Sequence, residues 1–133
     1  MNRITGFANA VYPATDLDAS VKAFTALLGD DPVFRTADYA MYATGIALSS
    51  KPWVQFPLPF WNVDDIAVAH QEMIAAGATA LGEVADGSLA EIGTAVVTNG
   101  DPATGIVDMP GSRLAVLRAA DGNLIAINQT TGW

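Results

Sequence analysis

Residues 12–29, YPATDLDASVKAFTALLG, decide the fold class that this sequence predicts. Apolar side chains recur at helical spacing from Leu17 to Leu28, which is typical of a helix with one buried face. Asp16 stands where an amino-terminal cap is needed, and Gly29 stands where a left-handed residue would end the helix. The stretch therefore predicts one amphipathic helix with both ends marked.

A second segment of the same design lies at residues 64–78, DDIAVAHQEMIAAGA. Its apolar stripe consists of Ile66, Ala69, Met73 and Ala76. Asp64 or Asp65 can cap the amino end, and Gly77 can end the helix. An extended apolar run precedes each helix and strand-like segments follow it, so the chain is predicted to repeat a unit of strand, helix and strands.

Short strands are predicted after the first helix and near the end of the chain, because strand-forming residues there are bounded by Asp and Gly turn signals. They cover residues 32–38, 39–45, 46–50, 112–119 and 123–129. The last two flank a turn at residues 120–122, as in an antiparallel hairpin. Residues 84–111 are longer than their counterpart in the first half, which predicts an inserted hairpin or loop.

The length of the chain sets the expected domain organisation. Its 133 residues suit a single domain over residues 1–133, long enough to bury a core. The repeat divides it into a first module at about 1–50 and a second module at about 53–133. Two helices among many strands predict an α+β fold class.

Composition and charge exclude several functions. Hydrophobic residues make up 51% of the chain and charged residues 15%, which argues against disorder. No apolar run is long enough for a membrane span and no signal core is present, so we expect a soluble, cytoplasmic protein. Cysteine is absent, which excludes disulfides and thiolate chemistry. The formal net charge of −8 disfavours nucleic acid and anionic membrane as partners and suits neutral or cationic ones, although it also serves solubility alone.

Three motifs in this order carry a family resemblance: Asp-Leu-Asp with Leu-Leu-Gly around the first helix, Asp-Asp-Ile to Ala-Ala-Gly around the second, and Asp-Gly-Asn at residues 121–123. The chain resembles, over nearly its whole length, the vicinal oxygen chelate superfamily, which includes glyoxalase I, extradiol dioxygenases, and fosfomycin and bleomycin resistance proteins. The resemblance implies two tandem βαβββ modules that form a curled mixed sheet around a cavity.

In that superfamily a divalent metal is commonly held by His and Glu residues on equivalent strands of the two halves. Counted from the helix-opening aspartates and from Asp-Gly-Asn, three of these positions hold Asn9, Leu58 and Ala126. Divalent cations need several oxygen or imidazole ligands, so we expect neither a metal nor another cofactor. The fourth position lies on the strand at residues 46–50, which contains no His, Asp or Glu.

The predicted ligand site is an apolar wall with a few polar groups that orient a small organic molecule, as is common in ligand pockets. The predicted ligand-binding residues are Asn9, Tyr42, Phe56, Leu58, Phe60, Arg113, Ala126 and Asn128. Arg113 and Arg118 lie on opposite faces of one strand, so at most one of them can face the cavity. The aromatic members of the set can instead fill a core between sheet and helices.

No catalytic residue is predicted. His70 is the only histidine; it matches no family ligand position and is expected to be a partly exposed or helix-packing side chain. The paired aspartates lie at helix ends and turns, where capping explains them. No serine-nucleophile motif is present.

Three functions are compatible with these observations. The resemblance implies a metal-independent protein of the bleomycin resistance type, which sequesters a small organic molecule and forms a homodimer. The alternative is a metal-dependent lyase, isomerase or dioxygenase whose ligands the counts above miss, with Glu83 and Glu91 as candidates. A third possibility is a metal-free enzyme or a binding subunit of a larger complex.

Overall fold

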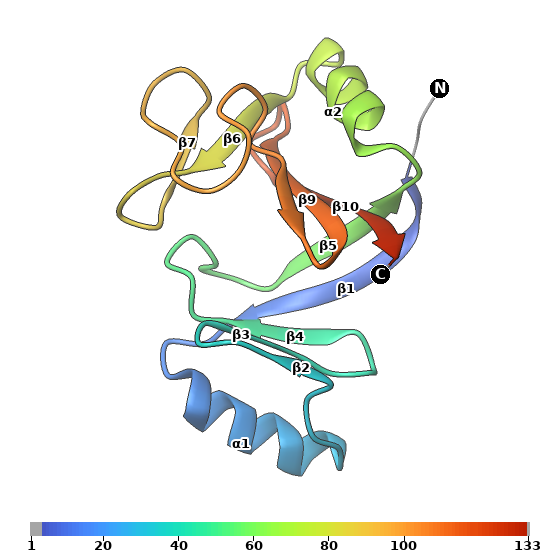
Figure 1. Ribbon diagram of the computed structural model, residues 1–133, viewed down its shortest axis with the longest axis vertical. Helices are drawn as coiled ribbons and strands as arrows, with labels where there is room; N and C mark the ends of the chain where they lie inside the picture. Colours follow the sequence, from blue (N-terminus) through green and yellow to red (C-terminus); the bar gives the residue numbers. More distant parts are fainter. Residues whose placement is uncertain (1–3, 133) are drawn as a thin grey trace. The chain divides into compact units, whose positions relative to one another are not determined.

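The structure, a computed structural model, describes residues 4–132. Within these residues, two helices and ten strands give the predicted α+β class (Figure 1). The elements are β1 (Ile4–Pro13), α1 (Leu17–Leu28), β2 (Phe34–Arg35), β3 (Tyr39–Met41), β4 (Ile46–Ser49), β5 (Leu58–Val63), α2 (Ile66–Ala75), β6 (Thr79–Glu83), β7 (Leu89–Glu91), β8 (Val107–Met109), β9 (Gly111–Arg118) and β10 (Leu124–Gly132). They divide into two compact units, which we call the α1 unit (residues 9–59) and the α2 unit (residues 4–8 and 60–132).

The α1 unit holds four strands in the order β2-β3-β4-β1. β1 and β4 run parallel, whereas the other neighbouring pairs are antiparallel. One face of α1 packs on this sheet: Leu17 and Val21 join a buried core with Ala40, Tyr42 and Leu48. The helical stripe predicted from the sequence is therefore the face that builds this core.

The α2 unit repeats this arrangement with additions. Its strands follow the order β5-β10-β9-β6-β7, and β8 pairs with β9. β5 and β10 are parallel and the remaining pairs antiparallel, so β5, β10, β9 and β6 correspond to β1, β4, β3 and β2. The predicted tandem βαβββ modules and the mixed character of the sheet are confirmed.

Both helices begin at predicted aspartates. Oδ1 of Asp16 accepts a hydrogen bond from the backbone N–H of Ala19 at 3.1 Å. Oδ1 of Asp65 accepts from the backbone N–H groups of Ala67 and Val68 at 3.1 and 3.2 Å. These bonds satisfy amide groups that the first turn of a helix leaves without partners.

The helices end differently. Gly29 takes the left-handed conformation, with φ of 78°, and caps α1 as predicted. The last residue of α2 is Ala75, Ala76 is an exposed cap with φ of −85°, and the left-handed residue is Gly77. The buried stripe of α2 thus ends before Ala76, while Met73 still packs against the core.

The second module carries the predicted insertion. Residues 84–111 contain β7, β8 and the loop between them. The sequence pattern does not predict β6. Three of its five residues, Ala80, Gly82 and Glu83, are of types that are depleted in strands. Its pairing with β9 and β7 determines its conformation. α2 packs over the sheet beside this insertion, in a core that includes Ile66, Ile106 and Ile127.

Candidate functional site

β10 presents two chemically different faces. Ile127 belongs to the core under α2, and Ile125 packs against that core. Ala126, between them in sequence, points to the opposite face because side chains alternate along a strand. Ala126 is 0% exposed. β10 therefore has one helix-packed face and a second face that carries Ala126.

A row of apolar side chains crosses this second face of the α2 unit. Ala126 pairs with Phe60 of β5 on one side and with Val116 of β9 on the other, and Val116 pairs with Leu81 of β6. We call Phe60, Ala126, Val116 and Leu81 the α2-unit row. All four side chains are buried. The row is therefore apolar and shielded from water.

The α1 unit contains an equivalent row. Val11 of β1 pairs with Ala47 of β4, which pairs with Met41 of β3, which pairs with Phe34 of β2. Because Val11 and Phe60 stand at equivalent places in the two modules, Ala47 is the counterpart of Ala126. It is also 0% exposed.

This register supplies the position that counting along the sequence could not give. The resemblance aligns Asn9, Leu58 and Ala126 with metal-ligand positions, and the register adds Ala47 as the counterpart of Ala126. None of them is His, Asp, Glu or Cys. In the described part of the chain, no group of three or more such residues is arranged to hold a metal ion. The side chains at these positions do not fit a divalent cation.

A pair of asparagines lies beside the α2-unit row. Asn128 of β10 pairs in register with Asn62 of β5. Nδ2 of Asn128 donates a hydrogen bond to Oδ1 of Asn62 at 2.8 Å and lies 3.4 Å from Oγ1 of Thr130. Asn128 is 9% exposed. The α2 unit thus carries two polar amides, each two residues along its strand from the apolar row.

A second polar contact occurs in the α1 unit. Nδ2 of Asn9 donates a long hydrogen bond of 3.5 Å to the hydroxyl oxygen of Tyr39. The Tyr39 ring also packs against Phe34, with 6.2 Å between centroids. Burial raises the pKa of the Tyr39 hydroxyl, and the hydrogen bond with Asn9 acts in the opposite direction. Tyr39 therefore stays protonated at neutral pH and can donate or accept a hydrogen bond.

Tyr42 lies elsewhere, in the core under α1. It is 1% exposed, and its hydroxyl donates to the carbonyl of Val21 at 3.0 Å and bonds Oγ1 of Thr25 at 2.9 Å. Both contacts are to α1. The geometry assigns this aromatic residue to core packing rather than to the face that carries Ala47.

The two arginines of β9 lie on opposite faces. Arg118 shares the face of Val116, and its guanidinium donates to the Glu91 carboxylate at 2.6 Å. Arg113 shares the face of Leu117, which belongs to the core under α2. Arg118 is therefore the arginine on the face of the α2-unit row, and it is already ion-paired there.

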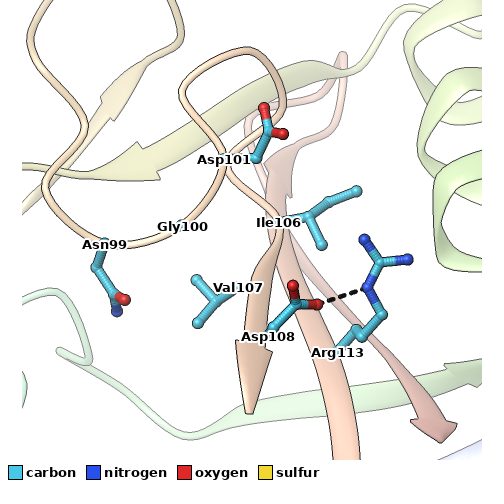
Figure 2. A pocket seen from close by; sticks show the side chains of 7 residues that line it. All are labelled: Asn99, Gly100, Asp101, Ile106, Val107, Asp108 and Arg113. Carbon is cyan, nitrogen blue, oxygen red and sulfur yellow. Dashed lines mark hydrogen bonds and ion pairs between the residues drawn. The ribbon is translucent and has the colours of Figure 1, made fainter.

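Arg113 lines a separate polar pocket of about 370 Å³ in the insertion. The other lining residues are Asn99, Gly100, Asp101, Ile106, Val107 and Asp108. Figure 2 shows the ion pair between Arg113 and Asp108, which are cross-strand neighbours on β9 and β8, with Nε donating to Oδ1 at 2.7 Å. The only cationic group of the lining is thus engaged by one of its two carboxylates.

The remaining predicted residues separate by burial. Leu58 is buried on the same face of β5 as Phe60. Phe56 precedes the strand and is 51% exposed. Glu91, a candidate metal ligand, lies on the edge strand β7, where it pairs in register with Leu81 of β6. Its carboxylate forms an ion pair with Arg118. Of the eight predicted site residues, Phe60, Ala126 and Asn128 therefore lie together on one face of the α2 unit.

His70 is buried at 5% exposure, so the helix-packing alternative holds. It hydrogen-bonds the backbone of Thr104 in the insertion, while its Nε2 has no partner within the described residues. Burial lowers the pKa of the imidazole, and the bond to Thr104 acts in the opposite direction. His70 links α2 to the insertion as a neutral side chain.

Comparison with known proteins identifies the fold. No family model matches the chain, and no curated protein matches it. Among solved structures, the Mn(II)-bound glyoxalase from Novosphingobium aromaticivorans superposes with a TM-score of 0.60 at 18% identity, over 97% of this chain and 40% of that one. A glyoxalase/bleomycin resistance protein/dioxygenase superfamily member from Vibrio splendidus 12B01 gives 0.54 at 15% identity, over 98% and 99% of the two chains.

A third structure carries a different activity in its name. The NAD-dependent benzaldehyde dehydrogenase from Legionella pneumophila matches with a TM-score of 0.58 at 12% identity, over 98% of this chain and 100% of that chain. The chain thus has the vicinal oxygen chelate fold of the glyoxalase/bleomycin resistance protein/dioxygenase superfamily. Matches at this level of identity show the fold alone, so function must be argued from the site.

Proposed function

We propose that this protein binds a small organic molecule against the α2-unit row without a metal, and acts by sequestering that molecule. The observation that carries the proposal is the pair of alanines, Ala47 and Ala126, at equivalent positions of the two modules. Where a metal enzyme needs ligand atoms, these residues present methyl groups. A methyl-lined wall favours contact with apolar parts of a ligand.

Further features support the same function. The α2-unit row joins one aromatic and three aliphatic side chains, and the amides of Asn62 and Asn128 lie beside it. The net charge of −8 favours the approach of neutral or cationic ligands over anionic ones. We further propose that the protein acts in the cytoplasm. The resemblance to resistance proteins implies that it does so as a homodimer.

Fluorescence titration with Nile red, an uncharged apolar dye, tests this proposal. The chelator-treated protein is expected to bind the dye saturably, and added EDTA is expected to leave the affinity unchanged. Ala126→Leu would fill the centre of the α2-unit row and is expected to weaken binding by about tenfold, equivalent to about 1.4 kcal/mol.

The matched control is Ala75→Leu, because Ala75 is exposed on α2 and the chemical change is the same. This variant is expected to bind the dye as the original chain does. Thermal unfolding of both variants verifies that they are folded before the titration. Equal dye affinities for Ala126→Leu and the original chain would contradict the proposed site.

A further inference from the structure

The asparagine pair on β5 and β10 leaves a hydrogen-bond donor and an acceptor unused. A primary amide has two N–H donors and one carbonyl acceptor. The bond from Asn128 to Asn62 uses a donor of Asn128 and the acceptor of Asn62. What remains is Nδ2 of Asn62, which donates, next to Oδ1 of Asn128, which accepts.

These two atoms are not completely buried. Within residues 4–132, the buried side-chain nitrogen and oxygen atoms without a partner are Nε1 of Trp53 and Nε2 of His70. Neither Nδ2 of Asn62 nor Oδ1 of Asn128 is among them, and no further hydrogen bond joins the two amides in this part of the chain. Both atoms therefore retain some exposed surface.

The fold itself does not require an amide pair at this place. The equivalent positions of the first module are Pro13 and Ser49, which also pair in register. Proline offers no side-chain hydrogen bond, and Oγ of Ser49 already accepts from the backbone N–H of Lys51 at 3.1 Å. At this place the first module has a hydroxyl that is already hydrogen-bonded, that of Ser49. The second module has the amides of Asn62 and Asn128, each with an unused hydrogen-bonding group.

Position gives the amides their significance. Asn62 and Asn128 stand two residues along their strands from Phe60 and Ala126, so the unused donor and acceptor border the apolar row on the same face. An incompletely satisfied amide near an apolar surface is unfavourable when it is fully desolvated. A ligand that covers the row must either satisfy these groups or bear that cost.

We propose that Asn62 and Asn128 select a ligand with an amide-like edge, in which one hydrogen-bond donor stands beside one acceptor, attached to an aromatic or aliphatic body. Carboxamides and lactams have this edge. The donor of Asn62 meets the ligand carbonyl, the acceptor of Asn128 meets the ligand N–H, and the body lies on the α2-unit row. The inference rests on the proposed function, since it concerns the same face.

Competition against Nile red tests the selectivity with two matched probes. Naphthalene-2-carboxamide carries both a carbonyl and an N–H, whereas 2-acetylnaphthalene has the same shape and carbonyl without the N–H. The original chain is expected to bind the carboxamide about tenfold more tightly, since one unpaired buried hydrogen-bonding group costs about that much. In the double variant Asn62→Leu/Asn128→Leu this preference is expected to be lost, so that the two probes compete with the dye at similar affinities.

Thermal unfolding of the double variant shows whether it folds. If it does not fold, a second variant tests the same selectivity. Asn128→Ser places at β10 the residue that the first module has at the equivalent position, and it is expected to reduce the preference in the same direction. Equal affinities of the original chain for the two probes, with dye binding still sensitive to Ala126→Leu, would overturn the selectivity and leave the proposed function standing. Loss of that sensitivity would overturn both.

Discussion

The α-carbon of Gly105 lies directly against the backbone carbonyl of Leu81: a β-carbon at position 105 would stand 2.0 Å from that oxygen. Gly105 also has a left-handed φ of 80°. Both observations require glycine here. This contact, together with the bond between His70 and Thr104, docks the insertion on the sheet of the α2 unit.

Gly105→Ala is therefore expected to destabilise the protein by about 2 kcal/mol or more, because left-handed strain and a steric clash act together. Urea unfolding measures the loss. Gly122→Ala is the control: its φ is 94° but no atom lies within 4 Å of the added β-carbon, so it has the strain without the clash. Equal losses in the two variants would show that the contact with Leu81 is unimportant.

His70 gives stability a pH dependence. Burial is the main cause of its lowered pKa, so the folded state binds a proton less readily than the unfolded state, where the pKa is about 6.5. The stabilisation is present above that value and is lost as the pH falls through the lower pKa of the folded state. We expect the free energy of unfolding to decrease as the pH is lowered below about 6.5.

Urea unfolding at a series of pH values, for the original chain and for His70→Leu, separates this effect from the carboxylates. Asp86 and Asp121 have pKa values lowered by hydrogen bonds from Ser88 and Asn123, so they act only in more acidic solution. His70→Leu is expected to flatten the profile just below about pH 6.5. An unchanged profile would show that His70 does not titrate in this range.

Substitution of Tyr42 distinguishes a role in the core from a role in ligand binding. Tyr42→Phe removes a hydroxyl bonded to Val21 and Thr25 and is expected to lower the free energy of unfolding by about 1 kcal/mol. Its affinity for Nile red is expected to be that of the original chain, because the ring faces α1. A dye affinity reduced about tenfold in a folded variant would return Tyr42 to the ligand site.

The sequence predicts this fold well where the signals are local. Capping aspartates and helical spacing give both helices to within one residue at their first turns, and a turn signal gives the hairpin of β9 and β10. β6 escapes prediction because its strand state comes from pairing with β9 and β7. The packing of His70 requires the insertion to fold over α2, which no local pattern indicates.

The candidate site is predictable in part for the same reason. Alternation along β10 separates Ala126 from Ile127 without knowledge of any other strand. Ala47 and Asn62 emerge only from the parallel pairing of strands far apart in the chain. The faces of Tyr42 and Arg113 likewise depend on register, which a sequence count does not supply.

Calorimetric titration of chelator-stripped protein with nickel, zinc, manganese and anaerobic ferrous iron tests the central claim most directly. Because Asn9, Ala47, Leu58 and Ala126 provide no set of metal ligands, we predict no tight binding of one ion per chain, while Nile red still binds. Tight binding of one ion per chain by any of these metals would contradict the account and assign the protein to the metal-dependent enzymes.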